Sequence, residues 1–337
     1  MNSLPLVSIV TPAFNAEPFL VQCIESVLAQ TYQNWEYIIV NNCSTDRTLL
    51  IAESYMARDA RIRVITNRLF VGAIENHNVA LQQPAQHSRY CKVVSADDWI
   101  EPDFLTMTVK VAEAHPTVGI VGSYQGRGDE VKWMGLPANV EFFSGREVCR
   151  MALLKDLSIF GNPTSSLFRT ETVRRAGRFF PHLGPHADTT ACYEHLQHCD
   201  YGFVHKVISH ERIHQGQISA RVRQLNMGAL AALEHVLKYG PVYLTPAEFE
   251  RTRKEAWSRY YRSMGAWVLK LGSRELWNYH RNGLNNLNQC LSWNRVLRGA
   301  VAELVEEVKT PNVAFGKASR VLSSKLRRAS HSSVAGL

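Results

Sequence analysis

The stretch VVSADDWIEPDF, residues 93–104, joins an apolar run to two adjacent carboxylates. β-Branched and small residues lead into Asp97 and Asp98, and an aromatic residue and a proline follow. This order is typical of a buried strand that ends at a site. Two like charges so close together raise the pKa of one acid or require a cation. The alternative is that Asp97 caps a helix over WIEPDF and Asp98 is solvated.

Apolar runs before this stretch alternate with segments of helical periodicity. Strands are predicted for LVSIVTPAFN (residues 6–15), WEYIIVNN (35–42), IRVIT (62–66) and YCKVVSA (90–96), with helices over 19–30, about 47–58 and about 73–81. Strands that alternate with helices indicate an α/β fold with a mostly parallel sheet. Ligands of such sheets bind at the carboxyl ends of the strands.

The rest of the chain divides into two sections. Residues 101–220 combine a helix, a strand over 118–124, a strand entered from a loop at 161–169 and a helix over 187–199. From about residue 221 the sequence is helical and basic. We therefore expect one large domain over 1–220, with halves of about 1–100 and 101–220, and a helical region over 221–337.

The composition is that of a soluble globular protein. Hydrophobic residues make up 45% of the chain and charged residues 20%. The seven cysteines form no CxxC pair, so neither a disulfide framework nor a zinc site is expected. No apolar run reaches the roughly 18 residues of a spanning helix, and the start lacks a signal-peptide pattern, so we expect a cytoplasmic protein.

The net charge of +8 is unevenly distributed, because no acid follows Glu307. In this tail Phe315, Ala318, Leu322 and Leu326 recur at spacings of three and four between basic residues. That spacing predicts a helix lying on an anionic membrane surface. A solvated, frayed end is the alternative, and nucleic-acid binding ranks last because no binding motif is present.

Familiar phosphate loops are absent. The junction TPAFNAEPF, residues 11–19, contains no glycine, and no GxxxxGK[ST] motif occurs. Both observations argue against a dinucleotide-binding dehydrogenase and a P-loop protein. A nucleoside diphosphate can instead be held through a divalent metal, which suits paired carboxylates at a strand end.

Four blocks resemble, in order and spacing, those of the family 2 glycosyltransferases. They are VSIVTPAFN, CIESVLAQTYQNWEYIIVNNCSTDRT, NRLFVGAIENHNVAL and VVSADDWIEPDF, within a resemblance over about residues 6–215. The resemblance implies the GT-A fold, which is Rossmann-like, here with a C-terminal helical extension. It also implies inverting transfer of a sugar from a nucleoside-diphosphate donor to an acceptor hydroxyl, usually with Mg²⁺ or Mn²⁺.

The resemblance assigns roles to particular residues. It implies that Pro12, Ala13 and Asn15 lie against the donor nucleotide. Asn41 and Asn42 stand where the family usually has an acid that reads the base. An amide oxygen accepts a hydrogen bond from a base N–H more weakly than a carboxylate does, so base choice stays open.

In the paired acids the resemblance implies a DxD-like motif, although Ser95 stands where many members have a first Asp. Asp98 would bind the metal, and Asp97 the ribose or the metal. The segment SHERIHQGQIS, residues 209–219, is similar to the family's closing segment. It implies that Arg212 approaches the donor diphosphate and that His214 approaches the metal.

Inverting transfer needs a general base on the acceptor side. The resemblance puts Asp188 at that position, although the usual Glu before it is Ala187. An N-cap role is the alternative for Asp188, and Glu194 is a weaker candidate for the base. The segment at 161–169 would form the acceptor side, with Asn162 and Thr164 as hydrogen-bond donors, or would be a plain loop.

The leading hypothesis is therefore a metal-dependent, inverting glycosyltransferase of surface polysaccharide or glycolipid synthesis. Its partners would be a nucleoside-diphosphate sugar and a glycan or lipid-linked acceptor, with peripheral contact to the inner face of the membrane through the basic tail. The alternative is a non-catalytic sugar-nucleotide-binding or scaffold protein of the same fold. That alternative is motivated by Asn41 and Asn42, which stand where the family usually has an acid.

Overall fold

The computed structural model describes residues 4–175, 177–181, 184, 186–214 and 218–309. Two compact units divide them. The first comprises the described residues up to Val222 together with His235–Thr252, and the second comprises Arg223–Glu234 and the described residues from Arg253 onward. The tail helix predicted around Phe315–Leu326 lies outside the described residues. Within those residues no helix is both long and apolar enough to cross a bilayer.

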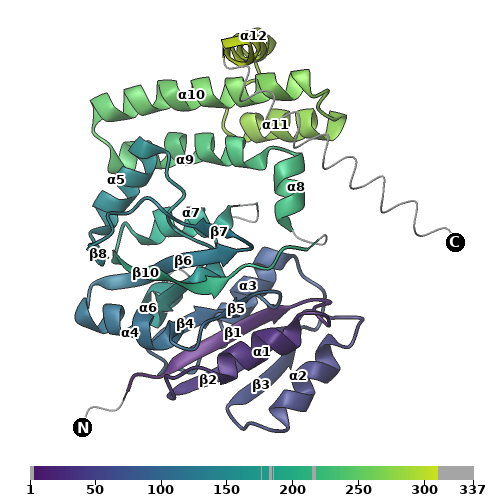
Figure 1. Ribbon diagram of the computed structural model, residues 1–337, viewed down its shortest axis with the longest axis vertical. Coiled ribbons are helices and arrows are strands. Elements are labelled where there is room, and N and C mark those ends of the chain that lie inside the picture. Colours follow the sequence, from purple (N-terminus) through teal and green to yellow (C-terminus); the bar gives the residue numbers. More distant parts are fainter. Residues whose placement is uncertain (1–3, 176, 182–183, 185, 215–217, 310–337) are drawn as a thin grey trace, which may run out of the picture. The chain divides into compact units, whose positions relative to one another are not determined.

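The first half of the first unit has the predicted alternation of strands and helices (Figure 1). Its elements are β1 (Val7–Ala13), α1 (Leu20–Leu28), β2 (Trp35–Asn41), α2 (Thr48–Met56), β3 (Ile62–Thr66), α3 (Ala73–Leu81) and β4 (Tyr90–Val93). Strands β3, β2, β1 and β4 lie in that order and run parallel. Each strand starts and ends within a few residues of its predicted limits. Apolar periodicity depends only on neighbouring residues, so it can be read without knowing the tertiary structure.

The second half adds an antiparallel component. Its elements are β5 (Trp99–Ile100), α4 (Phe104–Ala114), β6 (Val118–Arg127), β7 (Glu130–Lys132), β8 (Phe142–Phe143), α5 (Gly145–Lys155), the 3-10 turn η1 (Pro163–Ser165), β9 (Ser166–Arg169), α6 (Thr170–Arg175), α7 (Ala187–His195) and β10 (Asp200–His210). The sheet continues from β4 through β9, β6 and β10 to β5. Strand β9 runs antiparallel to both neighbours, so the sheet as a whole is mixed.

The proposed helix over WIEPDF is wrong. Trp99 and Ile100 form β5, which pairs with β10, and helix α4 begins only at Phe104, after the N-cap residue Asp103. Asp97 therefore caps no helix at this point. The proline at 102 explains the late start, because the residue before a proline avoids the helical conformation.

One hydrophobic layer lies between the sheet and helices α1, α2 and α4. Alternate residues of the strands, such as Val7 and Ile9 of β1, face this layer together with Leu20, Ile24 and Phe104 of the helices. Helices α1 and α2 cover the same face of strands β1 to β3 (Figure 1). The seven cysteines form no disulfide bond in this structure.

The register of the parallel strands positions the site. Ala13 of β1 pairs with Asn41 of β2, and Val10 pairs with Val93 of β4. The residues that follow these strands therefore leave the sheet at one edge. That edge holds Asn15, Asn42 and the paired acids, as expected for the carboxyl ends of parallel strands.

The helical part of the chain consists of α8 (Ile218–Gln224), α9 (Met227–Tyr243), α10 (Pro246–Leu269), α11 (Arg274–Asn286) and α12 (Trp293–Lys309). Helices α8, α9 and α10 each contribute residues to both units. In the second unit the backbones of α10 and α12 approach closely. A Cβ added to Gly265 of α10 would lie only 2.2 Å from the backbone nitrogen of Ala300 in α12. Only glycine allows backbones to approach so closely.

Candidate active site

Asp98 is the most buried acid of the site, with 3% of its surface exposed. Its Oδ2 accepts a hydrogen bond from the Thr164 hydroxyl at 2.7 Å, and its Oδ1 accepts one from the Arg212 backbone N–H at 3.3 Å. Burial, followed by the negative charge of Asp97, raises the pKa of Asp98 well above the ordinary range, against the effect of these hydrogen bonds. The carboxylate is held in place but lacks a counter-charge sufficient to offset its burial.

Asp97 is the more accessible acid, with 33% of its side chain exposed. Its Oδ2 lies 3.0 Å from Nε2 of His214, and its carbonyl oxygen accepts a hydrogen bond from Nε of Arg212 at 3.0 Å. The segment after β10 thus brings a histidine and an arginine to the paired acids. The structure brings together all four residues that we expected around the donor diphosphate and the metal.

The Arg212 guanidinium lies near two aromatic rings, 5.2 Å from the centre of Phe19 and 5.0 Å from that of Trp99. It also donates a hydrogen bond to Oε1 of Gln22. The His214 ring packs on Phe19 at 4.6 Å. Sequence reasoning did not identify Phe19, Gln22 or Trp99, although Trp99 directly follows the paired acids.

Thr164 contacts one of the paired acids, and its expected contribution to the acceptor side stays a prediction. It is completely buried, and its hydroxyl donates to Asp98 while accepting a hydrogen bond from the Ser95 N–H at 3.1 Å. A hydroxyl proton given to Asp98 is not available to an acceptor substrate. Thr164 therefore holds the Asp98 carboxylate in place through this hydrogen bond.

Asn162 builds the turn that carries Thr164. It is the N-cap residue of η1, and its Oδ1 accepts hydrogen bonds from the Ser165 N–H and from Nε2 of Gln125, both at 3.1 Å. Its amide oxygen thus fixes η1 and links it to β6. The expected contribution of Asn162 to the acceptor side stays a prediction.

A buried lysine, which sequence reasoning missed, lies behind the same turn. Lys92 of β4 directs its ammonium group to the backbone carbonyls of Thr164 and Ser166, the latter at 3.2 Å. The group lies 3.7 Å from the centre of the Phe104 ring. Burial lowers the pKa of Lys92 well below the ordinary range, and the charge of Asp98 opposes this effect.

Asn41, the last residue of β2, and Asn42, which follows it, are almost completely buried. Oδ1 of Asn42 accepts hydrogen bonds from Nδ2 of Asn67 and from the Val71 N–H at 2.9 and 3.0 Å, and its Nδ2 donates to the Val71 carbonyl at 2.8 Å. Oδ1 of Asn41 accepts a hydrogen bond from the Ser44 N–H at 3.2 Å. Both amides thus hold neighbouring loops in place, and their expected role in reading the base stays a prediction.

The end of β1 is the remaining part of the expected donor site. Pro12 and Ala13 are buried within the strand, whereas Asn15 is exposed with a positive φ of 45°. Nearby, the exposed rings of Phe14 and Phe70 lie 4.9 Å apart. Exposed aromatic faces beside such an edge are suited to stacking on a nucleobase. Phe14 lies inside the PAFN motif, so the sequence contained a signal for it.

Asp188 lies in the first turn of α7, and the N-cap position is occupied by His186 with a φ of 66°. The N-cap alternative for Asp188 is therefore wrong. Burial raises the pKa of Asp188 above its ordinary value, partly offset by the charge of His186. Glu194, further along α7, is engaged with Lys238 and Tyr239, both at 2.7 Å, which leaves Asp188 as the better candidate for the base.

The charges of both the candidate base and one of the paired acids act on His77 of α3. Burial lowers the pKa of His77, while the carboxylates of Asp97 and Asp188 both act to raise it.

The residues present are suited to a divalent cation that also binds substrate. Among the described residues, no group of three His, Cys, Asp or Glu side chains forms an all-protein metal site. Mg²⁺ and similar ions are commonly held by one or two carboxylates plus substrate phosphates and water. The adjacent carboxylates of Asp97 and Asp98, with a raised pKa at Asp98 and His214 beside them, fit that requirement.

The family model described as Glycosyl transferase family 2 matches residues 8–176, about half of the chain. The chain therefore belongs to the family 2 glycosyltransferases. An uncharacterized glycosyltransferase of Haemophilus influenzae is 35% identical over 124 residues, which are 37% of this chain and 38% of that relative. The matches span less than half the length of each curated relative compared.

Two solved structures share the fold. S. aureus TarS 1–349 in complex with UDP-GlcNAc superposes with a TM-score of 0.62 at 17% identity, covering 84% of this chain and 80% of that one. The mannosyltransferase PcManGT from Pyrobaculum calidifontis, in complex with GDP-Man and Mn²⁺, has a TM-score of 0.55 at 17% identity, covering 91% and 89%. These likenesses confirm the GT-A type of fold predicted from the sequence.

Proposed function

We propose that this protein transfers a sugar from a nucleoside-diphosphate donor to an acceptor hydroxyl, with inversion and with the help of Mg²⁺ or Mn²⁺. The observation that carries the proposal is the assembly of Asp97 and Asp98 with Arg212 and His214 at the carboxyl edge of the sheet. The site joins a cation-binding acid pair to a fixed guanidinium, which together suit a diphosphate.

The donor half would comprise about residues 1–100 within a catalytic domain of 1–220, followed by a helical region over 221–337. Asp98, Asp97 and His214 would hold the divalent ion, which supplies positive charge against the diphosphate leaving group. The Arg212 side chain is fixed by Gln22 and the Asp97 carbonyl, so it is oriented before the donor arrives. Phe14 and Phe70 would stack on the base.

Acceptor activation is assigned to Asp188. Its raised pKa makes its carboxylate a better proton acceptor than an ordinary aspartate. In this proposal the acceptor hydroxyl binds at Asp188, whose charge acts, like that of Asp97, on the pKa of His77. Acceptors with a glycan or lipid-linked glycan hydroxyl suit this role, in surface polysaccharide or glycolipid synthesis.

Contact with a membrane at its cytoplasmic face would bring the enzyme to a lipid-linked acceptor. Helix α12 exposes Trp293, Leu297, Val301, Leu304 and Val305 at helical spacing, and the basic tail follows it in the sequence. Liposome sedimentation tests this contact. Equal binding by the full chain and by a chain ending at Glu307 would exclude a role for the tail.

Thermal unfolding with UDP, GDP, CDP and dTDP sugars, with and without Mn²⁺, tests the proposed donor site. A donor that binds the native state raises the unfolding midpoint by mass action. We expect one donor to give a metal-dependent shift that Asp98→Asn abolishes and Glu194→Gln retains. If the folded protein responds to none of the donors, the proposed activity fails and the scaffold alternative gains support.

A further inference from the structure

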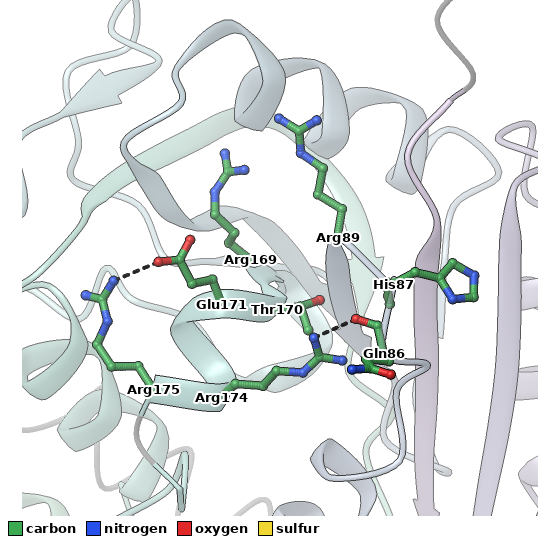
Figure 2. Close-up of a pocket in the computed structure, with 9 residues that line it drawn as sticks. Gln86, His87, Arg89, Arg169, Thr170, Glu171, Arg174 and Arg175 are labelled. Carbon is green, nitrogen blue, oxygen red and sulfur yellow. Dashed lines mark hydrogen bonds and ion pairs between the residues drawn. The ribbon is translucent and has the colours of Figure 1, made fainter.

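A polar pocket lies between the loop before β4 and helix α6 (Figure 2). Its volume is about 850 Å³, and its lining comes from the loop before β4, the end of β9 and helix α6. The pairing of Tyr90 with Arg169 puts the lining at the amino end of β4, whereas Asp97 and Asp98 follow the carboxyl end. The pocket is therefore separate from the proposed donor site.

Four arginines line this pocket, Arg89, Arg169, Arg174 and Arg175, together with one acid, Glu171. Arg175 pairs with Glu171 at 3.1 Å, and Arg89 pairs with Glu113 at 3.1 Å. Both arginine side chains are 50% exposed, and ion pairs of such exposed side chains contribute little stability and are easily exchanged. The positive charge of the lining exceeds its negative charge.

Two of the guanidinium groups are held by backbone carbonyls, which do not cancel their charge. Arg169 donates to the carbonyls of Val118 and Ala112, both at 2.9 Å. Arg174 donates to the carbonyls of Gln86 and Ala85, both at 2.8 Å. Among the described residues, no ion pair with a carboxylate is recorded for either arginine.

This arrangement favours the binding of phosphate oxygens. A guanidinium has five N–H donors in a planar fork, and the carbonyls use two of them in each arginine. Because the Arg169 and Arg174 side chains are already ordered, binding would cost less side-chain conformational entropy than binding to mobile lysines. Phosphate oxygens match the fork in pairs, which makes the contact strong and directional.

The basic surface continues beyond this pocket. A neighbouring pocket of about 660 Å³ shares Arg169, Glu171 and Arg175 and adds Arg146 and His198 to the lining. We propose that the pocket of Arg89, Arg169, Arg174 and Arg175 binds phosphate groups of a ligand other than the sugar donor. The ligand is either a small soluble phosphate or the headgroup of an anionic phospholipid. This assignment does not depend on the proposed transfer reaction.

The test uses the full chain in EDTA, so that metal-dependent binding at the paired acids does not contribute. Pyrophosphate is titrated by calorimetry, and vesicles of phosphatidylcholine with or without phosphatidylglycerol are sedimented. The test variant is Arg174→Gln/Arg175→Gln, because both side chains are exposed. The control, Arg58→Gln/Arg274→Gln, removes two exposed charges outside the pocket.

We expect the test variant to bind its probe about tenfold more weakly, since it loses charge-assisted contacts that the control keeps. Pyrophosphate binding that the test variant weakens identifies a soluble ligand, and vesicle binding that the test variant weakens and the control keeps identifies a headgroup. Equal binding by the test and control variants, or no binding of either probe, overturns the proposal. The metal-dependent thermal shift with sugar donors should be unchanged in the test variant, which separates this result from the fate of the proposed activity.

Discussion

Asp98 illustrates how burial at one residue trades stability for binding. The carboxylate lies in the protein interior beside a second negative charge, and its hydrogen bonds from Thr164 and Arg212 do not offset the desolvation. Because its pKa is raised in the folded state, ionisation at neutral pH opposes folding. Removing that charge should therefore stabilise the metal-free protein.

We predict that Asp98→Asn raises the free energy of unfolding by about 1–2 kcal/mol at pH 7 in EDTA. The amide oxygen can still accept the hydrogen bond from Thr164, so the fold is retained. The same substitution should abolish the metal-dependent donor shift. Chemical denaturation measures the change in the free energy of unfolding. A variant less stable than the parent would contradict the prediction, because it would show that the negative charge of Asp98 is stabilised in the folded protein.

Asp188 should determine the acidic limb of the activity. A base must be ionised, and burial raises the pKa of Asp188 above its ordinary value, so turnover should fall as the pH drops through that raised pKa. Asp188→Asn should lower kcat by about 10²–10⁴-fold and leave donor binding intact. Initial rates across pH at saturating donor provide the measurement. Unchanged turnover in the variant would remove Asp188 from this role.

At the scale of elements, the turn η1 determines the position of Thr164 beneath Asp98. Its capping box joins Asn162 and Ser165, and the residue before it, Gly161, has a φ of 75°. A Cβ at Gly161 would lie 2.2 Å from Oγ of Ser165. A side chain there would disturb both the backbone and the cap.

We predict that Gly161→Ala destabilises the protein by about 1–3 kcal/mol and weakens donor binding, because η1 can no longer hold Thr164 in place. Gly177→Ala is the matched control, since Gly177 has a φ of 61° but no atom within 4 Å of an added Cβ. It should cost about 1 kcal/mol through backbone strain and leave donor binding unchanged. Equal effects on donor binding would argue against the role of η1.

At the scale of the whole molecule, a buried histidine should make the second compact unit lose stability in acid. His280 of the second unit is completely buried, with its ring nitrogens 3.0 Å from the Leu225 carbonyl and the Tyr260 hydroxyl. Burial lowers the pKa of His280 to about 4. The unfolded chain takes up the proton more readily than the folded one, so stability decreases as the pH falls.

We predict that this contribution, about 3 kcal/mol at most, is present above pH 6.5 and is lost between about pH 6.5 and 4. Tryptophan fluorescence follows the transition, because four of the seven tryptophans, Trp257, Trp267, Trp277 and Trp293, lie in the second unit. His280→Gln should flatten the pH dependence, whereas His198→Gln, at an exposed histidine, should not. If stability depends on pH in the same way in the unsubstituted protein, His280→Gln and His198→Gln, the prediction is contradicted.

The sequence by itself determined the strands and helices up to β4 and the position of the paired acids. Apolar periodicity is a local property of the sequence, so it predicts each strand and helix separately. In a parallel sheet the carboxyl ends of the strands lie at one edge, which places the residues that follow them together. The sequence also identified the segment carrying Arg212 and His214, although their proximity to Asp97 could not be derived from spacing. The buried Lys92 and the support role of Thr164 produced no recognisable local pattern.

Only the tertiary structure decided how distant segments meet. His214 reaches Asp97 across 117 residues, and Thr164 reaches Asp98 across 66. These contacts depend on the sheet order β4–β9–β6–β10–β5, in which strands far apart in the chain become neighbours. The same order gathers Arg89, Arg169 and Arg174 into one pocket. Hydrogen bonds and charges act over a few ångströms in space, whatever the separation along the chain, and so the sites emerged only with the fold.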